Sequence, residues 1–329
     1  MRHSRDNQLL PWRVQQVYKS RLERIVEHKE LNRPRLDRRK FLLAGSAGVA
    51  GAWVSSKFLG SRLFNPRAFA APPLTQKVAA VDTVTLGKTG IRSSRLAMGT
   101  GTVGSGHHSN QTGLGIDGLS RLLLNGYDHG LRFFDAADSY GSHPHLAEAL
   151  KHVPRDQVTI LTKTFSRDPK SVRDDLDRFR RELGVDYIDI CLMHCLTEGD
   201  WTERFRGAMD VLSEAKEKGI IRAHGCSCHS IEALRAAAKS PWVEVDLARV
   251  NPIGSHMDAS PDAVVSVLRG MKAAGKSVIG MKILGQGDLR GHVDDALRYA
   301  LSLGVLDAFT IGAESKAEQE DLIRRIAAA

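Results

Sequence analysis

The chain is predicted to fold as an α/β protein, a (β/α)8 barrel of the TIM type, with an N-terminal leader outside the barrel. From about Val84, short β-branched runs alternate with amphipathic stretches, and this alternation repeats eight times. Strict strand–helix alternation implies a parallel sheet, and eight units in about 245 residues match a closed barrel. A doubly wound sheet is the alternative, but no G-x-G-x-x-G motif opens the first unit.

A small hairpin is predicted at Val84–Ser94, before the first barrel strand, with Gly87 and Gly90 at its turns. The predicted strands are Arg95–Gly99, Arg132–Asp135, Val158–Lys163, Tyr187–His194, Ile221–Ser227, Val243–Val250, Ser277–Ile283 and Asp307–Ile311. Each strand is followed by a predicted helix, in order Gly118–Asn125, Pro144–Lys151, Ser171–Leu183, Arg204–Lys218, Ile231–Ala238, Pro261–Ala274, Val293–Ser302 and Lys316–Ile326.

The charge of the chain is concentrated at its N-terminal end. Residues 1–70 carry 15 Lys and Arg against 5 Asp and Glu, while the remaining residues carry 32 against 33. The formal net charge of +9 therefore belongs to the leader and not to the predicted barrel. This distribution gives no support to a nucleic-acid partner for the folded body.

A leader is predicted at residues 1–70. Arg38 and Arg39 precede Phe41, which opens an uncharged, Gly- and Ala-rich stretch at 41–56. That stretch is short for a membrane span, which needs about 20 apolar residues. The arrangement resembles a twin-arginine export signal. We therefore expect the export machinery as a partner and a periplasmic or otherwise exported location.

A cleavage pattern of the small-x-small type stands at Ala68–Ala70 and is followed by a predicted linker at 71–83. The barrel is then expected to span residues 84–329. The alternative interpretations of the leader are a buried helix and an uncleaved membrane anchor.

Four chemically active side chains are predicted to meet at one rim of the barrel. Asp135 ends the second strand and Tyr140 follows it closely, while Lys163 ends the third strand and His194 the fourth. Barrel enzymes place their chemistry at the C-terminal ends of strands. Each residue alone also suits a structural role, as a cap, a packed aromatic, a solvated lysine or a hydrogen-bonded core histidine. Their convergence on one rim favours catalysis.

The combination suits proton transfer to a carbonyl oxygen. A tyrosine with its ordinary pKa near 10 is a poor acid at neutral pH, and a neighbouring ammonium group such as that of Lys163 lowers this pKa. A carboxylate holds the lysine in place and keeps it charged, and a histidine donates a hydrogen bond to the substrate carbonyl. Together they would protonate the carbonyl oxygen as hydride reaches its carbon.

The sequence from about 84 to 326 resembles the aldo-keto reductase family. The resemblance is carried by LGKTGIRSSRLAMGTG at 86–101, RFFDAADSYG at 132–141, the Thr162-Lys163 strand end, YIDICLMH at 187–194, GCSCHS at 225–230, VIGMKILGQG at 278–287 and TIGAESKAEQ at 310–319. It implies a small-molecule substrate, either a carbonyl reduced with NADPH or an alcohol oxidised with NADP. It also implies that Tyr140 donates the proton, that Lys163 and Asp135 tune it, and that His194 orients the carbonyl.

The resemblance also implies where the nicotinamide ring would bind. Ser227 matches a serine that contacts the carboxamide, but Cys228 stands where the family has asparagine. Arg249 stands about where a glutamine usually lies beneath the nicotinamide, with Asn251 close by. These departures put the nicotinamide geometry in question.

Two further strand ends would hold the rest of the dinucleotide. The segment with Lys282, Leu284 and Gly285 should line the pyrophosphate, because glycine permits close backbone approach. The last strand end, with Gly312, Ser315 and Lys316, opens a helix whose N-terminus suits a 2′-phosphate. Glu314 would oppose that phosphate, so the expectation is NADP, with NAD as the alternative.

The four cysteines are predicted to lie on two neighbouring strands. Strand alternation directs Cys191 and Cys226 towards the helix layer and leaves Cys195 and Cys228 near the rim. The spacings C-x3-C and C-x-C are not a strong zinc pattern, so no metal site is predicted. Free thiols are expected, with a rim disulfide as the alternative.

Two other functions compete with the reductase hypothesis. The departures at Cys228 and Arg249 would suit a non-catalytic, nucleotide-binding or redox-sensing barrel. Lys163 or Lys282 could serve as the nucleophile of a Schiff-base aldolase. Export adds its own question, since NADPH has no obvious regeneration outside the cytoplasm. Either a bound cofactor serves a redox partner there, or the leader anchors an enzyme that faces the cytoplasm.

Overall fold

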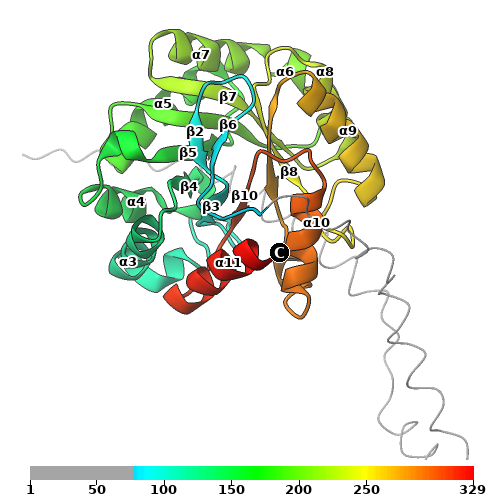
Figure 1. Ribbon diagram of the computed structural model, residues 1–329. Helices are drawn as coiled ribbons and strands as arrows, with labels where there is room; N and C mark the ends of the chain where they lie inside the picture. The colour runs from blue at the N-terminus through cyan, green and yellow to red at the C-terminus, as the bar shows by residue number, and fades with distance from the viewer. Residues whose placement is uncertain (1–76) are drawn as a thin grey trace, which may run out of the picture. The chain divides into compact units, whose positions relative to one another are not determined.

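The computed structural model describes residues 77–329, and the leader predicted at 1–70 lies outside this range. Eight parallel strands close into a barrel in which β10 pairs with both β3 and β9 (Figure 1). The predicted fold class is therefore confirmed. The barrel strands are β3 (Leu96–Gly99), β4 (Phe133–Asp135), β5 (Thr159–Thr164), β6 (Ile188–Leu196), β7 (Ile221–Cys228), β8 (Val245–Arg249), β9 (Ser277–Met281) and β10 (Ala308–Ile311).

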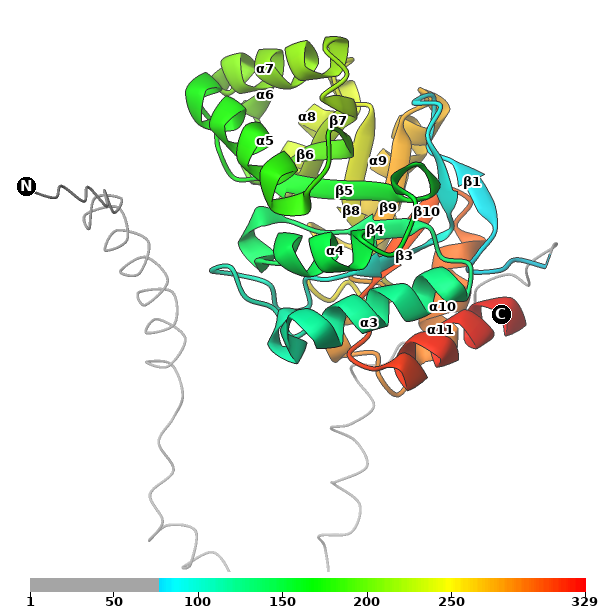
Figure 2. The ribbon, with the colours of Figure 1, turned by 90° about the vertical axis from the view of Figure 1, so that its left-hand side faces the viewer.

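Helices follow the strands and surround the sheet (Figures 1 and 2). They are α3 (Gly115–Asp128), α4 (His143–Leu150), α5 (Pro169–Leu183), α6 (Trp201–Arg204), α7 (Arg206–Glu217), α8 (Ile231–Lys239), α9 (Pro261–Ala273), α10 (Val293–Ser302) and α11 (Lys316–Ala328). Short 3-10 turns are η2 (Thr112–Leu114), η3 (Asp138–Tyr140), η4 (Arg155–Gln157) and η5 (Gly285–Gly287).

Helix α5 illustrates why these segments are helical. Its buried residues Val172, Leu176, Phe179 and Leu183 recur at the spacing of one helix face. The side chain of Asp168 caps the first turn by accepting a hydrogen bond from the backbone N–H of Ser171 at 2.9 Å. The helix ends where Gly184 takes the left-handed conformation.

Strand alternation separates two apolar layers. One lies between the sheet and the helices and includes Met98, Phe134 and Cys191. The other fills the barrel and includes Phe133, Leu161, Ile190, Leu192, Val245, Leu247 and Ile279. Side chains two residues apart on a strand share a face. By this rule the inward-facing side of the strands includes five polar residues at the C-terminal rim, namely Asp135, Lys163, His194, Ser227 and Arg249.

A two-stranded hairpin contributes to the interior layer. Strands β1 (Thr83–Thr85) and β2 (Arg92–Ser94) pair antiparallel, which confirms the predicted hairpin. Its fully buried Leu86 and Ile91 join the cluster inside the barrel. A Cβ atom at Gly87, whose φ is +53°, would come within 2.4 Å of the Ser277 backbone nitrogen, so the turn requires glycine.

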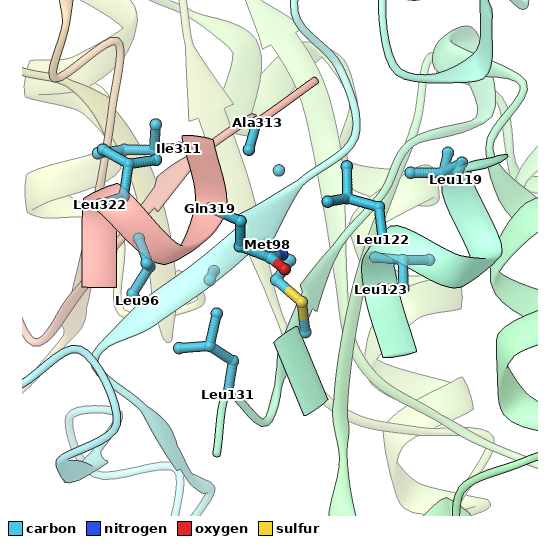
Figure 3. A pocket seen from close by; sticks show the side chains of 12 residues that line it. Leu96, Met98, Leu119, Leu122, Leu123, Leu131, Ile311, Ala313, Gln319 and Leu322 are labelled. Atoms are coloured by element: carbon cyan, nitrogen blue, oxygen red, sulfur yellow. The ribbon is translucent and has the colours of Figure 1, made fainter. Parts of the chain in front are cut away.

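An apolar pocket lies in the helix layer, outside the barrel. It is lined mainly by leucines of β3, α3 and α11, together with Met98 and Gln319 (Figure 3). The Gln319 carbonyl accepts a hydrogen bond from Asn125 Nδ2 at 3.0 Å, so its polar group is satisfied locally. We interpret the pocket as a packing gap. No helix among residues 77–329 is long and apolar enough to cross a membrane.

Candidate active site

Asp135 and Lys163 form a buried ion pair at the ends of neighbouring strands. The Lys163 Nζ lies 2.5 Å from Asp135 Oδ1 and also donates to the Ala136 carbonyl at 2.7 Å. The second carboxylate oxygen accepts a hydrogen bond from the Thr310 hydroxyl at 2.8 Å. Burial lowers the pKa of Lys163, but Asp135 and Tyr140 more than offset this and hold the pKa above its ordinary value. Lys163 therefore stays charged.

Tyr140 ends the turn η3 and lies beside this ion pair. The Lys163 Nζ is 4.8 Å from the centroid of the tyrosine ring. Burial raises the pKa of Tyr140 above its ordinary value, while the Lys163 ammonium opposes that shift. At neutral pH the group is a protonated phenol next to a cation, and this cation offsets part of the cost of forming the buried phenolate.

His194 completes the cluster. Its ring lies edge-on to the Tyr140 ring, with 5.7 Å between the centroids, and 4.5 Å from the ring of Phe165. Burial, reinforced by nearby cations such as Lys163, holds the pKa of His194 well below its ordinary value. The imidazole is therefore neutral. Its Nδ1 is buried and has no hydrogen-bond partner among residues 77–329.

The structure thus brings together the four residues predicted from the sequence, and it adds two glycines to them. A Cβ atom at Gly101 would lie 2.2 Å from Tyr140 Cε2, and one at Gly104 would lie 2.4 Å from Tyr140 Cδ1. The loop after β3 therefore packs its bare backbone against the tyrosine ring. The spacing Gly-x-x-Gly directly after the first barrel strand was the available signal for this contact.

The glycine contact predicts a positional effect on catalysis. Gly101→Ala is expected to push the Tyr140 ring aside and to lower kcat about 100-fold, because small misplacements of reacting groups cost this much. Steady-state kinetics would measure the effect, with circular dichroism to check the fold. Gly113→Ala is the matched control, because its Cβ would meet only His108 at an ordinary 3.6 Å. Equal kcat in the two variants would contradict the prediction.

Of the residues expected at the nicotinamide ring, Ser227 and Arg249 lie on the inward-facing side of their strands. The Ser227 hydroxyl oxygen accepts a hydrogen bond from the backbone N–H of Cys195 at 3.1 Å. The Arg249 side chain is already paired, with its Nε 3.0 Å from Asp258 Oδ1. Asp258 offsets part of the charge of Arg249. Burial lowers the pKa of the nearby His229, and Arg249 still lowers it further.

Cys228 is the last residue of β7, but it faces the helix layer and not the barrel interior, where a nicotinamide contact was expected. Its buried thiol contacts Cys226 Sγ at 3.8 Å and shares the layer outside the barrel. Alternation explains this, because a residue two positions from Cys226 must share its face. Cys195 Sγ instead lies 3.4 Å from His229 Nε2. Cys195 and Cys228 therefore have different neighbours, and both thiols are free in the structure.

The turn after β9 carries the residues expected at the pyrophosphate. The backbone N–H of Gly285 donates to the Lys282 carbonyl at 2.8 Å, and Leu284 between them is half-buried. The Lys282 Nζ donates to Gln286 Oε1 at 2.7 Å. Burial lowers the pKa of Lys282 below its ordinary value, and the positive charge of the nearby Arg249 lowers it further.

The start of α11 carries the remaining expected contacts. Ser315 caps the helix by accepting a hydrogen bond from the Glu318 N–H at 3.2 Å, and Lys316 is exposed. Glu318 accepts from the Glu314 N–H at 2.8 Å, and Glu314 accepts from Asn110 Nδ2 at 2.6 Å. Two carboxylates therefore stand at this N-terminus.

Gly312 lies where β10 meets the loop after β3. A Cβ atom there would come within 2.5 Å of Thr102 Oγ1 and 2.6 Å of Gln111 Nε2. The fully buried Gln111 also accepts a hydrogen bond from the Thr102 N–H at 2.8 Å. Gly312 therefore serves the packing of the loop that covers Tyr140.

Comparison with known proteins identifies the family. The model of the aldo/keto reductase family matches residues 95–307, which include all four residues of the Asp135 cluster. The chain belongs to the aldo/keto reductase family.

Two curated relatives are named for their cofactors. The NADH-specific methylglyoxal reductase of Escherichia coli is 29% identical over 44% of this chain and 51% of its own length. The NADPH-dependent D-xylose reductase of Meyerozyma guilliermondii is 30% identical over 28% of this chain and 33% of its own length. The chain thus matches about half or less of these relatives. Among solved structures, an aldo-keto reductase of Bacillus halodurans has a TM-score of 0.62 at 17% identity, covering 75% of this chain and 91% of that one, which shows the shared fold.

Proposed function

We propose that this aldo/keto reductase interconverts a small-molecule carbonyl and its alcohol with a nicotinamide dinucleotide as the redox cofactor. The observation that carries the proposal is the protonated Tyr140 beside the Asp135–Lys163 ion pair, with the neutral His194 ring 5.7 Å away. Family membership supports a nicotinamide cofactor, because relatives are named for NADH and for NADPH.

The residues of the cluster have separate tasks in carbonyl reduction. The neutral His194 imidazole would hold the substrate oxygen by donating a hydrogen bond. The Tyr140 hydroxyl would give its proton to that oxygen as hydride reaches the carbon, so that the C=O double bond becomes a C–O single bond and new C–H and O–H bonds form. The phenolate left behind would be stabilised by Lys163, whose own charge is fixed by Asp135. Water then returns the proton to Tyr140.

The rim residues fit a nicotinamide dinucleotide in their chemistry. When bound, the reduced nicotinamide supplies the hydride. Ser227 has a hydroxyl hydrogen to offer a carboxamide, and Lys282 and Lys316 are cations suited to phosphate groups. The choice between NADP and NAD depends on α11, where Lys316 favours a 2′-phosphate while Glu314 and Glu318 oppose it. We retain NADP as the expectation and NAD as the alternative.

The test of the proposed function is a titration of the purified protein with NADPH and NADH, followed by stopped-flow mixing with small aldehydes. Oxidation of either nucleotide coupled to alcohol formation supports the proposal. Nucleotide binding without hydride transfer would support the non-catalytic barrel instead. A lysine adduct trapped by borohydride would support the aldolase, which the charged and ion-paired Lys163 disfavours.

The ionisation of the cluster predicts the pH dependence of reduction. Since the pKa of Tyr140 is raised, its proton remains available through alkaline conditions, and since the pKa of His194 is lowered, that ring stays neutral in mild acid. We expect kcat for reduction to vary less than about twofold between pH values of about 6 and about 9. This range includes the ordinary histidine pKa of about 6.5. Oxidation should instead rise with pH, because it needs the phenolate. A step in reduction near the ordinary histidine pKa would contradict this prediction.

We also propose that the leader directs export by the twin-arginine route, which places the enzyme in the periplasm or elsewhere outside the cytoplasm. The support is the sequence Arg38-Arg39-Lys40-Phe41 before an uncharged stretch and the Ala68–Ala70 pattern. A cofactor carried in the folded protein would then need a redox partner outside the cytoplasm. Fractionation of cells that express the full chain tests this: export that is lost in Arg38→Lys/Arg39→Lys supports it, and a cytoplasmic or membrane-anchored protein contradicts it.

A further inference from the structure

A buried cluster of two thiols and a carboxylate lies on the outer side of the barrel, away from the proposed catalytic residues. Cys226 and Cys228 are two residues apart on β7 and share its outer face, and Asp246 of β8 stands opposite Cys226 in the strand pairing. All three residues are 0% exposed. The proposed reduction uses none of them.

The distances within the cluster match the coordination of a tetrahedral metal ion. The two sulfur atoms are 3.8 Å apart, and Asp246 Oδ1 lies 3.4 Å from Cys226 Sγ and 3.9 Å from Cys228 Sγ. With zinc–sulfur bonds of about 2.3 Å and zinc–oxygen bonds of about 2.0 Å, a tetrahedron has edges of about 3.8 Å and about 3.5 Å. The three atoms therefore lie near the corners of one tetrahedral face.

A carboxylate oxygen of this cluster lacks a hydrogen-bond partner. Asp246 Oδ2 is buried and has no hydrogen-bond partner in the described part of the chain, and the same holds for Asp258 Oδ2. An orphaned buried carboxylate oxygen is costly unless a cation or a donor satisfies it. The Asp246 carboxylate therefore has a buried oxygen that a bound cation would satisfy.

We propose that Cys226, Cys228 and Asp246 form a structural site for a divalent, thiophilic metal ion, with zinc as the expected occupant. Two thiolates and one carboxylate carry three negative charges, of which a divalent ion would offset two. Lys276 supplies further positive charge nearby, where its ammonium donates to the Val243 carbonyl at 2.9 Å. Binding would displace the thiol protons to solvent, so loading must accompany folding of this closed layer.

A second cluster of suitable side chains does not carry the same inference. Asp138, His143 and Glu182 also lie within mutual reach. There, however, Arg178 donates to Asp138 Oδ1 at 2.7 Å and to Glu182 Oε1 at 3.0 Å. A cation already occupies the position between these carboxylates, so we interpret that cluster as an ion-pair network.

The test is a metal analysis of the full chain, purified without chelator from cells grown with added zinc. We expect about one equivalent of zinc per chain. Protein from cells grown with cobalt in place of zinc should show a sulfur-to-cobalt charge-transfer band and the intense visible bands of tetrahedral cobalt. Cys226→Ala/Cys228→Ala should retain less than about a tenth of that metal. Cys191→Ala is the matched control, because Cys191 is a buried thiol of the same layer on neighbouring β6.

The variants remain informative if folding is impaired. Asp246→Asn keeps the side-chain volume, and it should shift or abolish the cobalt bands while near-ultraviolet circular dichroism shows native packing. Wild-type protein with no bound zinc and no cobalt spectrum would overturn the proposal. Full metal content in the double cysteine variant would overturn it as well. None of these measurements depends on the proposed reductase activity.

Discussion

Replacing Tyr140 with phenylalanine is expected to lower kcat for carbonyl reduction by about 10²- to 10⁴-fold, the usual contribution of a positioned general acid. The change removes the hydroxyl group and leaves the ring that packs against Gly101 and Gly104. Single-turnover oxidation of bound NADPH or NADH by an aldehyde would measure it. Cofactor affinity should change less than about twofold, since the ring retains its place.

Tyr127→Phe is the control for this variant. The Tyr127 hydroxyl lies on α3, where it is exposed and donates to Gln157, so its loss should leave kcat unchanged. If Tyr140→Phe retained wild-type kcat, the proton would have to come from another group. If it lost cofactor binding as well, the ring would hold the cofactor site together, and the separation of roles proposed here would be wrong.

Replacing Lys163 with methionine is expected to impair both stability and catalysis. Asp135, which is 5% exposed, would become an unpaired buried charge, and breaking a buried pair in this way costs about 3–5 kcal/mol of unfolding free energy. The phenolate formed by Tyr140 would also lose its neighbouring cation. We expect kcat to fall about 10²- to 10³-fold, as when a preorganised electrostatic contact is removed. Urea unfolding and steady-state kinetics would measure the two effects.

Two comparisons separate these effects. In Asp135→Asn/Lys163→Met, both charges are absent, so most of the lost stability should return while kcat stays low. Arg155→Met breaks another ion pair to a buried carboxylate, in which Arg155 Nη2 lies 2.7 Å from Asp189 Oδ2. This pair lies near the N-terminal end of β6, at the opposite end of the strand from His194. It should destabilise the barrel and leave kcat unchanged. A double variant with restored kcat would contradict the role assigned to Lys163.

Much of the fold follows from short-range patterns. Eight runs such as Val158–Lys163 alternate with amphipathic stretches such as Ser171–Leu183, and the observed β5 and α5 begin within two residues of these predictions. The rim cluster was predictable for the same reason. A parallel barrel places every strand end on one side, so Asp135, Lys163 and His194 had to meet once the strands were located.

The residues that were missed depend on contacts between distant segments. Gly101 and Gly104 matter because Tyr140 packs onto them, and Asp258 of the loop after β8 pairs with Arg249. The outward face of Cys228 could have been predicted, because the period of two along the strand assigns it to the face of Cys226.

Local periodicity and residue type therefore sufficed to predict the barrel, its hairpin and the meeting of four polar side chains at one rim, since each of these follows from strand ends and from alternation along one segment. The ionisation states of Tyr140 and His194, the packing of the loop after β3 and the approach of Asp246 to Cys226 and Cys228 were decided only by the tertiary structure. Their cause is burial and through-space charge, which depend on neighbours that are remote in the sequence.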